Sequence, residues 1–541
     1  MLASSCWVEG MFEVLAEDLL GRIGRVTTRS GRFETPAFLP VINPVTQEIP
    51  ASWMKENLGA EAVITNAYII SRRLRREAEE RGVHGILGFQ GVVMTDSGGY
   101  QVLEYGDIEA TPEEIALLQE KMGSDIAVPL DVPTGLTGRE RAEETVEQTL
   151  RNLEATIRVL ERRGERGALW AAPIQGGVHL DLLERCARKE VEMGFDLYSL
   201  GSPTPLMEGY RFNKLFPMLL TARRVIGPGK PLHLFGAGHP MMFAFAVALG
   251  ADTFDSASYY LYAKDGRYIT STGTLRVERL NYLPCGCPIC SKTSVEELRE
   301  MPKEQRTRLI AMHNLYACFR EVREIRQAIR DGRLMELLEQ RARSHPRLYQ
   351  AFHELLQSEE ALKLMEEHTP ITGRRGVNLF NSLSLRRPRV RRARRRLLEN
   401  YYRMRGRETL VLIPATRQIS MEKLSKLVAG DEFDAAFYGT PYGLIPYELR
   451  YVYPFSQTSY PSILLEEARE EIISTSLSQV SEARYQKILL MEAKAKWLRV
   501  FAEHLAEKLR ERGLELRMLR ERGGRESLSR PSGREKSRKA E

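Results

Sequence analysis

Between about residues 35 and 255, short apolar runs alternate with longer amphipathic stretches. The stretches at 111–122, 139–163 and 179–193 place apolar residues three and four positions apart, which predicts helices. The eight apolar runs between such stretches have the composition of buried strands, and they are TPAFLPV, AVITNAY, GVVMTDSGG, DIAVPLDVPT, LWAAPIQGG, GFDLYSLGS, PLHLFGAG and ADTFDSA. Eight strand-helix units predict a TIM barrel, and a doubly wound open sheet is the alternative with the same alternation.

Polar residues follow most of the apolar runs. In a TIM barrel the C-terminal ends of the strands meet at one mouth, where active sites lie. The residues at these ends are Asn66, Asp96, Asp131, Gln175, Gly201, Ser202, Gly236 to Gly238 and Asp255. Taken alone, each of the aspartates is more often explained by a helix-capping turn, so only their shared position makes them candidates. Two carboxylates across one mouth suit glycosidic chemistry, in which one attacks an anomeric carbon and the other transfers a proton.

The same strand ends provide groups that could hold a flat, polar ligand. The Gln175 amide and the backbone near Gly201 could hydrogen-bond its edge, and the aromatic rings of Tyr100 and Phe235 could stack on its faces. Packing at the barrel rim is the alternative for both aromatic residues.

A cluster of cysteines follows the eighth run. Cys285, Cys287 and Cys290 lie within six positions, and tetrahedral zinc needs one more ligand, for which His313 on the next helix is the best candidate. Four protein ligands leave no open position, so we expect one structural Zn²⁺ per chain. The alternative is three buried cysteines and a surface histidine. Six cysteines in 541 residues are too few for a disulfide scaffold.

The rest of the chain predicts smaller parts. The basic run RRPRVRRARRR spans Arg386 to Arg396 in a chain of net charge +7, and it fits either a polyanionic partner or a solvated helix face. TLVLIPA, DAAFYGT and GLIPYELRYVYPF read as strands, with a helix near 422–428. The charged C-terminal part lacks the apolar residues of a core, which predicts helix and disorder.

We therefore expect an α/β protein in four parts. They are a catalytic barrel at 1–345 with an inserted zinc subdomain at about 281–318, a helical basic connector at 346–406, a small α/β accessory domain at 407–480, and a charged tail at 481–541. No stretch approaches the roughly 20 apolar residues that span a bilayer, and the N-terminal residues do not resemble a secretory signal. A cytoplasmic location is expected.

Several of these motifs occur together in one known family. TDSGGYQ, PIQGG, HLFGAGHP, FDSA and CGCPIC with a later histidine have the order and spacing of tRNA-guanine transglycosylases, and the resemblance covers about residues 12–345. It implies a TIM barrel with a zinc subdomain, and a reaction that replaces a guanine in tRNA with a 7-deazaguanine through a covalent ribosyl-enzyme intermediate.

The resemblance also implies roles for single residues. Asp255 would be the nucleophile and Asp96 the general acid/base, with the reverse assignment as the alternative. The residues that would bind the guanine-like base are Asp131, Gln175, Gly201, Ser202, Tyr100 and Phe235. The zinc ligands would be Cys285, Cys287, Cys290 and His313. Many relatives have small apolar residues where this chain has Ser202, Pro203 and Thr204.

FDSASYYLYAKDGRYIT and PLMEGYRF resemble the archaeal branch of the family. That branch inserts 7-cyano-7-deazaguanine at position 15 in the tRNA D-arm, as the first step to archaeosine. Its members usually end in an RNA-binding PUA domain, which the C-terminal sequence does not resemble, so a separate PUA-domain protein is one expectation. Members commonly form homodimers.

Three alternatives follow from the same residues. An archaeosine synthase-like paralogue tends to lack the catalytic aspartates, and a non-catalytic tRNA-binding subunit would not require a nucleophile. The presence of Asp96 and Asp255 therefore argues against both. A sugar hydrolase would leave the cysteine cluster and the basic run without a purpose.

Overall fold

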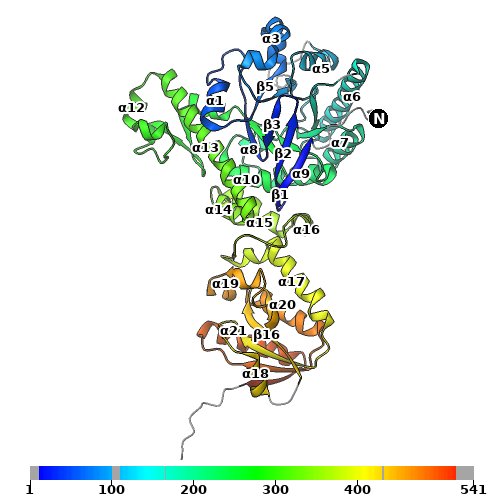
Figure 1. Cartoon of the computed structure of the whole chain (residues 1–541), viewed down its shortest axis with the longest axis vertical. Coiled ribbons are helices and arrows are strands. Elements are labelled where there is room, and N and C mark those ends of the chain that lie inside the picture. Colours follow the sequence, from blue (N-terminus) through cyan, green and yellow to red (C-terminus); the bar gives the residue numbers. More distant parts are fainter. Residues whose placement is uncertain (1–10, 100–109, 165, 429–431, 520–541) are drawn as a thin grey trace, which may run out of the picture. The chain divides into compact units, whose positions relative to one another are not determined.

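A computed structural model describes residues 11–99, 110–164, 166–428 and 432–519. The chain forms two compact units (Figure 1), the first of residues 1–378 and 386–391 and the second of 379–385 and 392–541. The helical segment 346–378, expected in a connector, thus belongs to the first unit. No helix within the described ranges is long and apolar enough to cross a membrane.

The first unit is built around an eight-stranded parallel sheet in the order β4-β11-β10-β9-β8-β7-β6-β5. These strands are β4 (Ala37–Pro40), β5 (Ala62–Asn66), β6 (Val92–Asp96), β7 (Ile126–Ala127), β8 (Leu169–Ile174), β9 (Leu197–Leu200), β10 (Leu232–Leu234) and β11 (Thr253–Ser256). A parallel bridge between Val41 and Ile64 joins the two edge strands. The eight predicted runs therefore form the eight strands of a TIM-like barrel.

The interior of the barrel follows from the two-residue period of the strands. Residues two apart, such as Ala37 and Leu39 on β4 or Val92 and Met94 on β6, face the same side and pack in one buried cluster. Polar residues take over that inward face at the C-terminal strand ends, as at Asp96 after Met94. The barrel is therefore packed below and polar at its mouth.

Helices cover the outside of the barrel, as Figure 1 shows. They are α1 (Ala51–Leu58), α2 (Ala67–Arg73), α3 (Arg75–Leu87), α5 (Pro112–Lys121), α6 (Arg139–Arg163), α7 (Leu180–Met193), α8 (Thr204–Glu208), α9 (Phe212–Ile226), α10 (Pro240–Ala248) and α11 (Ser258–Lys264). The three helices predicted from periodicity agree with α5, α6 and α7. A capping box of Thr111 and Glu114 fixes the start of α5.

A small antiparallel sheet lies before the barrel in the chain, formed by β1 (Phe12–Asp18), β2 (Gly21–Thr28) and β3 (Gly31–Glu34). Arg22 of this sheet reaches the N-terminal ends of the barrel strands. There Asp252, directly before β11, accepts hydrogen bonds from Arg22 Nε at 3.0 Å and from Arg223 Nη2 at 2.8 Å. All three side chains are buried, so this end of the barrel is sealed by a paired charge cluster.

The chain continues from the barrel into the cysteine region and a helical layer. The elements are β12 (Arg267–Ile269), β13 (Thr274–Arg276), η1 (Val277–Arg279), η2 (Cys290–Lys292), α12 (Val295–Glu300), α13 (Lys303–Asp331), α14 (Leu334–Ala342), α15 (Pro346–Gln357), α16 (Glu359–Glu367) and β14 (Val377–Asn378). The helix expected from Lys303 to about Arg343 is thus two helices, because Gly332 ends α13 in the left-handed conformation.

The second unit contains a five-stranded sheet in the order β17-β16-β15-β19-β20. Its strands are β15 (Thr409–Pro414), β16 (Phe433–Thr440), β17 (Gly443–Pro446), β19 (Lys487–Met491) and β20 (Glu515–Leu519). The other elements from residue 382 onward are η3 (Ser382–Arg386), α17 (Pro388–Asn400), η4 (Tyr402–Met404), α18 (Met421–Val428), η5 (Tyr447–Leu449), η6 (Phe455–Gln457), β18 (Thr458–Ser459), α19 (Ser462–Glu467), α20 (Arg469–Glu482) and α21 (Lys496–Glu511).

The C-terminal part differs from the expected charged tail at 481–541. As far as Leu519 it supplies β19, α21 and β20, and β19 pairs with β15 in the middle of the sheet. In the sequence its apolar residues are separated by many charged ones, which hides the pattern of a core. Leu498, Phe501 and Leu505 nevertheless recur three and four positions apart and are buried. Residues 520–541 lie outside the described ranges.

The basic run is likewise neither a free polyanion-binding surface nor a solvated face over most of its length. Arg387 is buried and its Nη2 lies 2.8 Å from Glu339. Arg391 pairs with Glu359 at 2.6 Å, and Arg394 pairs with Glu471. Only Arg395 and Arg396 of the run are exposed. Most of the run therefore forms ion pairs with acidic residues that are distant in sequence, and these pairs stabilise the fold.

Candidate active site and metal centre

A cavity of about 930 Å³ opens at the C-terminal ends of the barrel strands. Six of the residues predicted to react with or bind the ligand line it, namely Asp96, Asp131, Gln175, Gly201, Ser202 and Phe235, and so do the strand-end residues Asn66, Gly236 and Gly238. Asp255 directly precedes the lining residue Ser256 on β11 and is buried. Tyr100, which was expected to stack on a ligand, lies outside the described residues. The strand ends therefore converge as the barrel pattern predicts.

Asp96 ends β6 and is held by neutral donors. The side-chain amide of Asn66, at the end of β5, donates from Nδ2 to Asp96 Oδ2 at 3.0 Å, and the backbone N–H groups of Ser97 and Gly98 add to it. Burial raises the pKa of Asp96 to about 6, and the negative charge of Asp255 adds to this rise. The two carboxyl groups therefore interact, and Asp96 is suited to exchange protons near neutral pH.

Asp131 and Gln175 form a buried pair. Gln175 Nε2 donates to Asp131 Oδ2 at 2.6 Å, while its Oε1 accepts from Thr134 N at 2.9 Å and from Ser202 Oγ at 3.1 Å. Burial raises the pKa of Asp131 to about 7, with the charge of Asp96 adding to the effect. Because a side-chain amide has two N–H groups, Gln175 has one left for a ligand. Its first task is to orient Asp131.

Gly201 and Ser202 complete this side of the cavity after β9. A Cβ atom on Gly201 would lie 2.2 Å from Gln175 Nε2, so any larger residue would displace the Gln175 amide from its contact with Asp131. Ser202 has a φ of 61°, and its hydroxyl accepts from Gly135 N at 3.0 Å. Ser202 thus joins the loops that follow β7 and β9, a contact that the sequence alone did not indicate.

Asp255 is held by groups from β10 and from the loop that follows it. His233 Nε2 lies 3.0 Å from Asp255 Oδ1, and the backbone N–H of Gly236 donates to the same oxygen at 3.0 Å. The sequence reasoning missed His233, because a histidine inside an apolar run reads as core. Its inward position two residues before Phe235 was the available signal.

The site combines three carboxyl groups, of which Asp131 and Asp255 are buried and Asp96 is half-buried, and none of them has a lysine or arginine partner among the described residues. Environments of this kind separate the protonation states of neighbouring acids, so that one attacks while another transfers a proton. The arrangement therefore suits the glycosidic chemistry predicted from the strand ends.

The cysteine cluster forms a second site. The potential ligand atoms of Cys285, Cys287, Cys290 and His313 all lie within 4.8 Å of one another. His313 Nδ1 faces the thiols, at 3.3 Å from Cys290 Sγ, while Nε2 lies 2.8 Å from the carbonyl oxygen of Ile269. That carbonyl accepts the Nε2 proton and leaves Nδ1 free to bind a metal. These four residues together can hold a metal ion.

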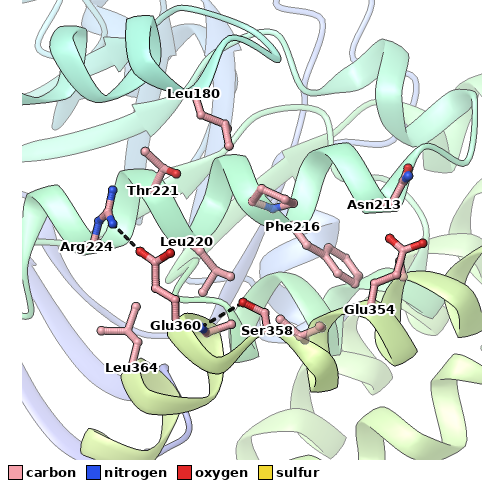
Figure 2. A pocket seen from close by; sticks show the side chains of 14 residues that line it. Leu180, Asn213, Phe216, Leu220, Thr221, Arg224, Glu354, Ser358, Glu360 and Leu364 are labelled. Carbon is pink, nitrogen blue, oxygen red and sulfur yellow. Dashed lines mark hydrogen bonds and ion pairs between the residues drawn. The ribbon is translucent and has the colours of Figure 1, made fainter.

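A second cavity, of about 200 Å³, lies on the outside of the barrel between α9 and the helices α15 and α16 (Figure 2). Its wall is mostly apolar, with Phe216, Leu220 and Leu364 among its side chains, and Arg224 pairs with Glu360 at its rim. None of the predicted site residues lines it, so it is separate from the chemistry at the mouth.

Comparisons with known proteins agree with this geometry. Residues 18–347 match the family model described as TGT: Queuine tRNA-ribosyltransferase. The tRNA-guanine(15) transglycosylase of Aeropyrum pernix is 44% identical over 479 residues, which cover 87% of this chain and 91% of the relative. The enzyme of the same name from Sulfolobus acidocaldarius is 39% identical, over 89% of this chain and 95% of the relative. That of Pyrococcus abyssi is 44% identical over 71% of this chain and 65% of its own length.

Proposed function

The chain belongs to the queuine tRNA-ribosyltransferase family, and from this membership and the geometry of the mouth we infer that it is a tRNA-guanine(15) transglycosylase. It exchanges guanine in tRNA for 7-cyano-7-deazaguanine, which is the first step of archaeosine formation. The observation that carries the proposal is the meeting of Asp96 and Asp255 at one barrel mouth, in a chain that matches curated enzymes of that name over most of its length.

Asp255 attacks the ribose. One of its carboxylate oxygens forms a bond to C1′, the bond from C1′ to N9 of guanine breaks, and the base leaves with the electron pair. Asp96, whose pKa burial raises to about 6, delivers a proton to the leaving base. The incoming 7-deazaguanine gives a proton to Asp96 and attacks C1′, which releases Asp255. The tRNA backbone stays intact throughout.

The base binds beside Asp131. The N–H groups of a guanine-like edge are donors, so they suit the Asp131 carboxylate, and the free N–H of Gln175 suits the base carbonyl oxygen. Phe235 lines the cavity and supplies a face for stacking, while the backbone of Gly201 and Ser202 lies beside Gln175 and can contact the same edge of the base. Tyr100 is proposed as the second stacking ring on the resemblance alone.

The metal is proposed to be one structural Zn²⁺ ion. Three thiolates and one imidazole match its preferred tetrahedral ligands and leave no open position for water. Chelation is expected to lower the melting temperature and leave the kcat of the remaining folded enzyme unchanged. Metal analysis of Cys287→Ala beside Cys318→Ala, which removes a buried thiol elsewhere, tests the site. Equal zinc content in the two variants would contradict the assignment.

A homodimer is proposed because members of the family commonly form one. Light scattering tests this proposal by measuring the mass of the protein in solution. A non-catalytic tRNA-binding paralogue is the second candidate function. It is disfavoured because binding alone does not require two carboxyl groups, such as those of Asp96 and Asp255, at one barrel mouth.

Incorporation of radiolabelled guanine into unmodified tRNA tests the function. Wild-type enzyme should incorporate the label and then lose it to 7-cyano-7-deazaguanine, and Asp96→Ala should do neither. Glu114→Gln, at an exposed helix cap, is the control for a lost carboxylate. Label that never enters tRNA with wild-type enzyme would favour the non-catalytic candidate.

A further inference from the structure

A buried histidine on the strand beside Asp255 holds the nucleophile from inside the barrel. His233 lies on β10 and is 1% exposed. Its two ring nitrogens contact two residues of β11, Nε2 reaching Asp255 Oδ1 at 3.0 Å and Nδ1 reaching Thr253 Oγ1 at 2.9 Å. Phe235 packs against the ring edge to face, with 4.8 Å between the ring centres. The ring is therefore fixed by contacts on three sides.

The chemistry of the partners determines where the protons lie. An ionised carboxylate only accepts hydrogen bonds, so Nε2 of His233 must carry the proton that faces Asp255. In the neutral ring Nδ1 is then the acceptor, and the hydroxyl of Thr253 donates to it. The backbone N–H of Gly236 donates to Oδ1 of Asp255 as well. Both donors therefore hold the same carboxylate oxygen.

We propose that His233 positions Asp255 so that its other oxygen, Oδ2, attacks the ribose. The inference rests on the proposed function, and it adds a positioning residue that does not touch the substrate. In the step, Oδ2 forms the bond to C1′ while Oδ1 stays bound to His233 and Gly236. The C1′ to N9 bond breaks, and guanine leaves with the electron pair and takes a proton from Asp96.

A comparison with the neighbouring strand β9 distinguishes this positioning role from the ordinary packing of a core histidine. Ser199 on β9 pairs in register with His233, is fully buried, and has a hydroxyl with no hydrogen-bond partner among the described residues. A polar side chain at this level of the barrel is thus tolerated without a bonded partner. His233 differs because its contacts connect the nucleophile to a second side chain on the same strand. Ser199→Ala is therefore a matched control.

The experiment measures the covalent ribosyl-enzyme directly. Enzyme in excess over labelled tRNA is quenched at short times, and the adduct is counted on denaturing gels for wild type, His233→Phe, His233→Gln and Ser199→Ala. His233→Phe keeps the volume and loses the donor, so adduct formation should slow on the order of 100-fold, the cost of a misplaced reacting group, with unchanged tRNA affinity. Glutamine places an N–H at a reach similar to Nε2 and should restore most of the rate.

Ser199→Ala should form the adduct at the wild-type rate. The inference is overturned if His233→Phe forms adduct as fast as wild type, or if His233→Gln is as slow as His233→Phe while both melt like wild type. If His233→Phe does not fold, His233→Asn takes its place, because the shorter amide cannot reach Asp255, and equal rates for asparagine and glutamine would then overturn it. A wild-type enzyme that forms no adduct would contradict the proposed function instead.

Discussion

Both ends of the barrel hold carboxyl groups away from solvent, but the groups that contact them differ. At one end the partners are cationic, and at the other they are neutral hydrogen-bond donors. At the N-terminal end, Asp252 accepts from two guanidinium groups and from the backbone N–H of Leu232 at 2.8 Å. At the mouth, Asp96 and Asp131 accept hydrogen bonds from neutral amides, and burial raises their pKa to about 6 and about 7.

This difference separates stability from chemistry within one fold. A buried carboxylate paired with cations stays ionised and resists change, so it serves as a fixed part of the structure. A buried carboxylate without a cation titrates near neutral pH and can take part in proton transfer. Substitutions at the two ends should therefore fail in different ways.

The largest effect is expected from Asp255→Asn. An amide cannot form the ribosyl ester, so guanine exchange should fall by about 10⁴-fold or more, while filter binding of tRNA stays near wild type. Guanine incorporation measures the loss. Exchange at the wild-type rate would remove Asp255 from the mechanism.

Asp252→Asn, three residues earlier at the other end of the barrel, is expected to act on stability instead. It leaves Arg22 and Arg223 buried without their carboxylate, which should lower the free energy of unfolding by about 3–5 kcal/mol. Burial already lowers the pKa of Arg223 to about 9. Urea titration measures the loss. A variant with normal stability and a lost kcat would contradict the assignment of Asp252 to stability and not to chemistry.

The affinity for guanine should weaken below pH 7. Asp131 must be ionised to accept from the base, and its pKa lies at about 7. The KM for guanine should therefore rise about tenfold for each pH unit below that value, with a smaller change in the KM for tRNA. A KM for guanine that stays constant from pH 8 to pH 5 would exclude Asp131 as the acceptor.

A gain in stability is expected from Asp131→Asn. The folded protein holds this proton up to about pH 7, whereas the unfolded chain releases it near 3.8, the ordinary pKa of an aspartate. The folded state therefore binds more protons between these values, and its stability falls as the pH rises through that window.

Removing the carboxyl group should remove this fall. We expect Asp131→Asn to melt higher than wild type at pH 8, by roughly 2–4 °C for each kcal/mol regained, and to equal it near pH 3. Differential scanning calorimetry at the two pH values measures the difference. A variant that melts lower at pH 8 would show that the Asp131 charge is stabilised, in contrast to its raised pKa.

The barrel could be predicted because its strands are apolar on both faces, a composition that is typical of buried parallel strands. Runs such as the one ending at Asp96 are apolar inward and outward, and their polar ends mark the mouth. The cysteine cluster was equally visible, since its spacing fits one chemistry. Both signals are local in the sequence.

What the sequence did not reveal depends on distant partners. The sequence does not show that Arg387 pairs with Glu339, about 50 residues away. It also does not show that β19, which begins at Lys487, pairs with β15 inside a sheet. Gln175 was expected to bind the base, yet most of its hydrogen bonds orient Asp131, Thr134 and Ser202. The contact of His233 with Asp255 likewise needs two strands placed side by side.

The single bridge between Val41 and Ile64 has a consequence for biosynthesis. The ladder of β4 is formed with β11, about 210 residues farther along the chain, which a ribosome adding 5–20 residues per second reaches about 10 to 40 s later. For that interval the nascent chain carries a nearly unpaired apolar strand. The active-site mouth is therefore completed only when the last barrel strand has left the ribosome.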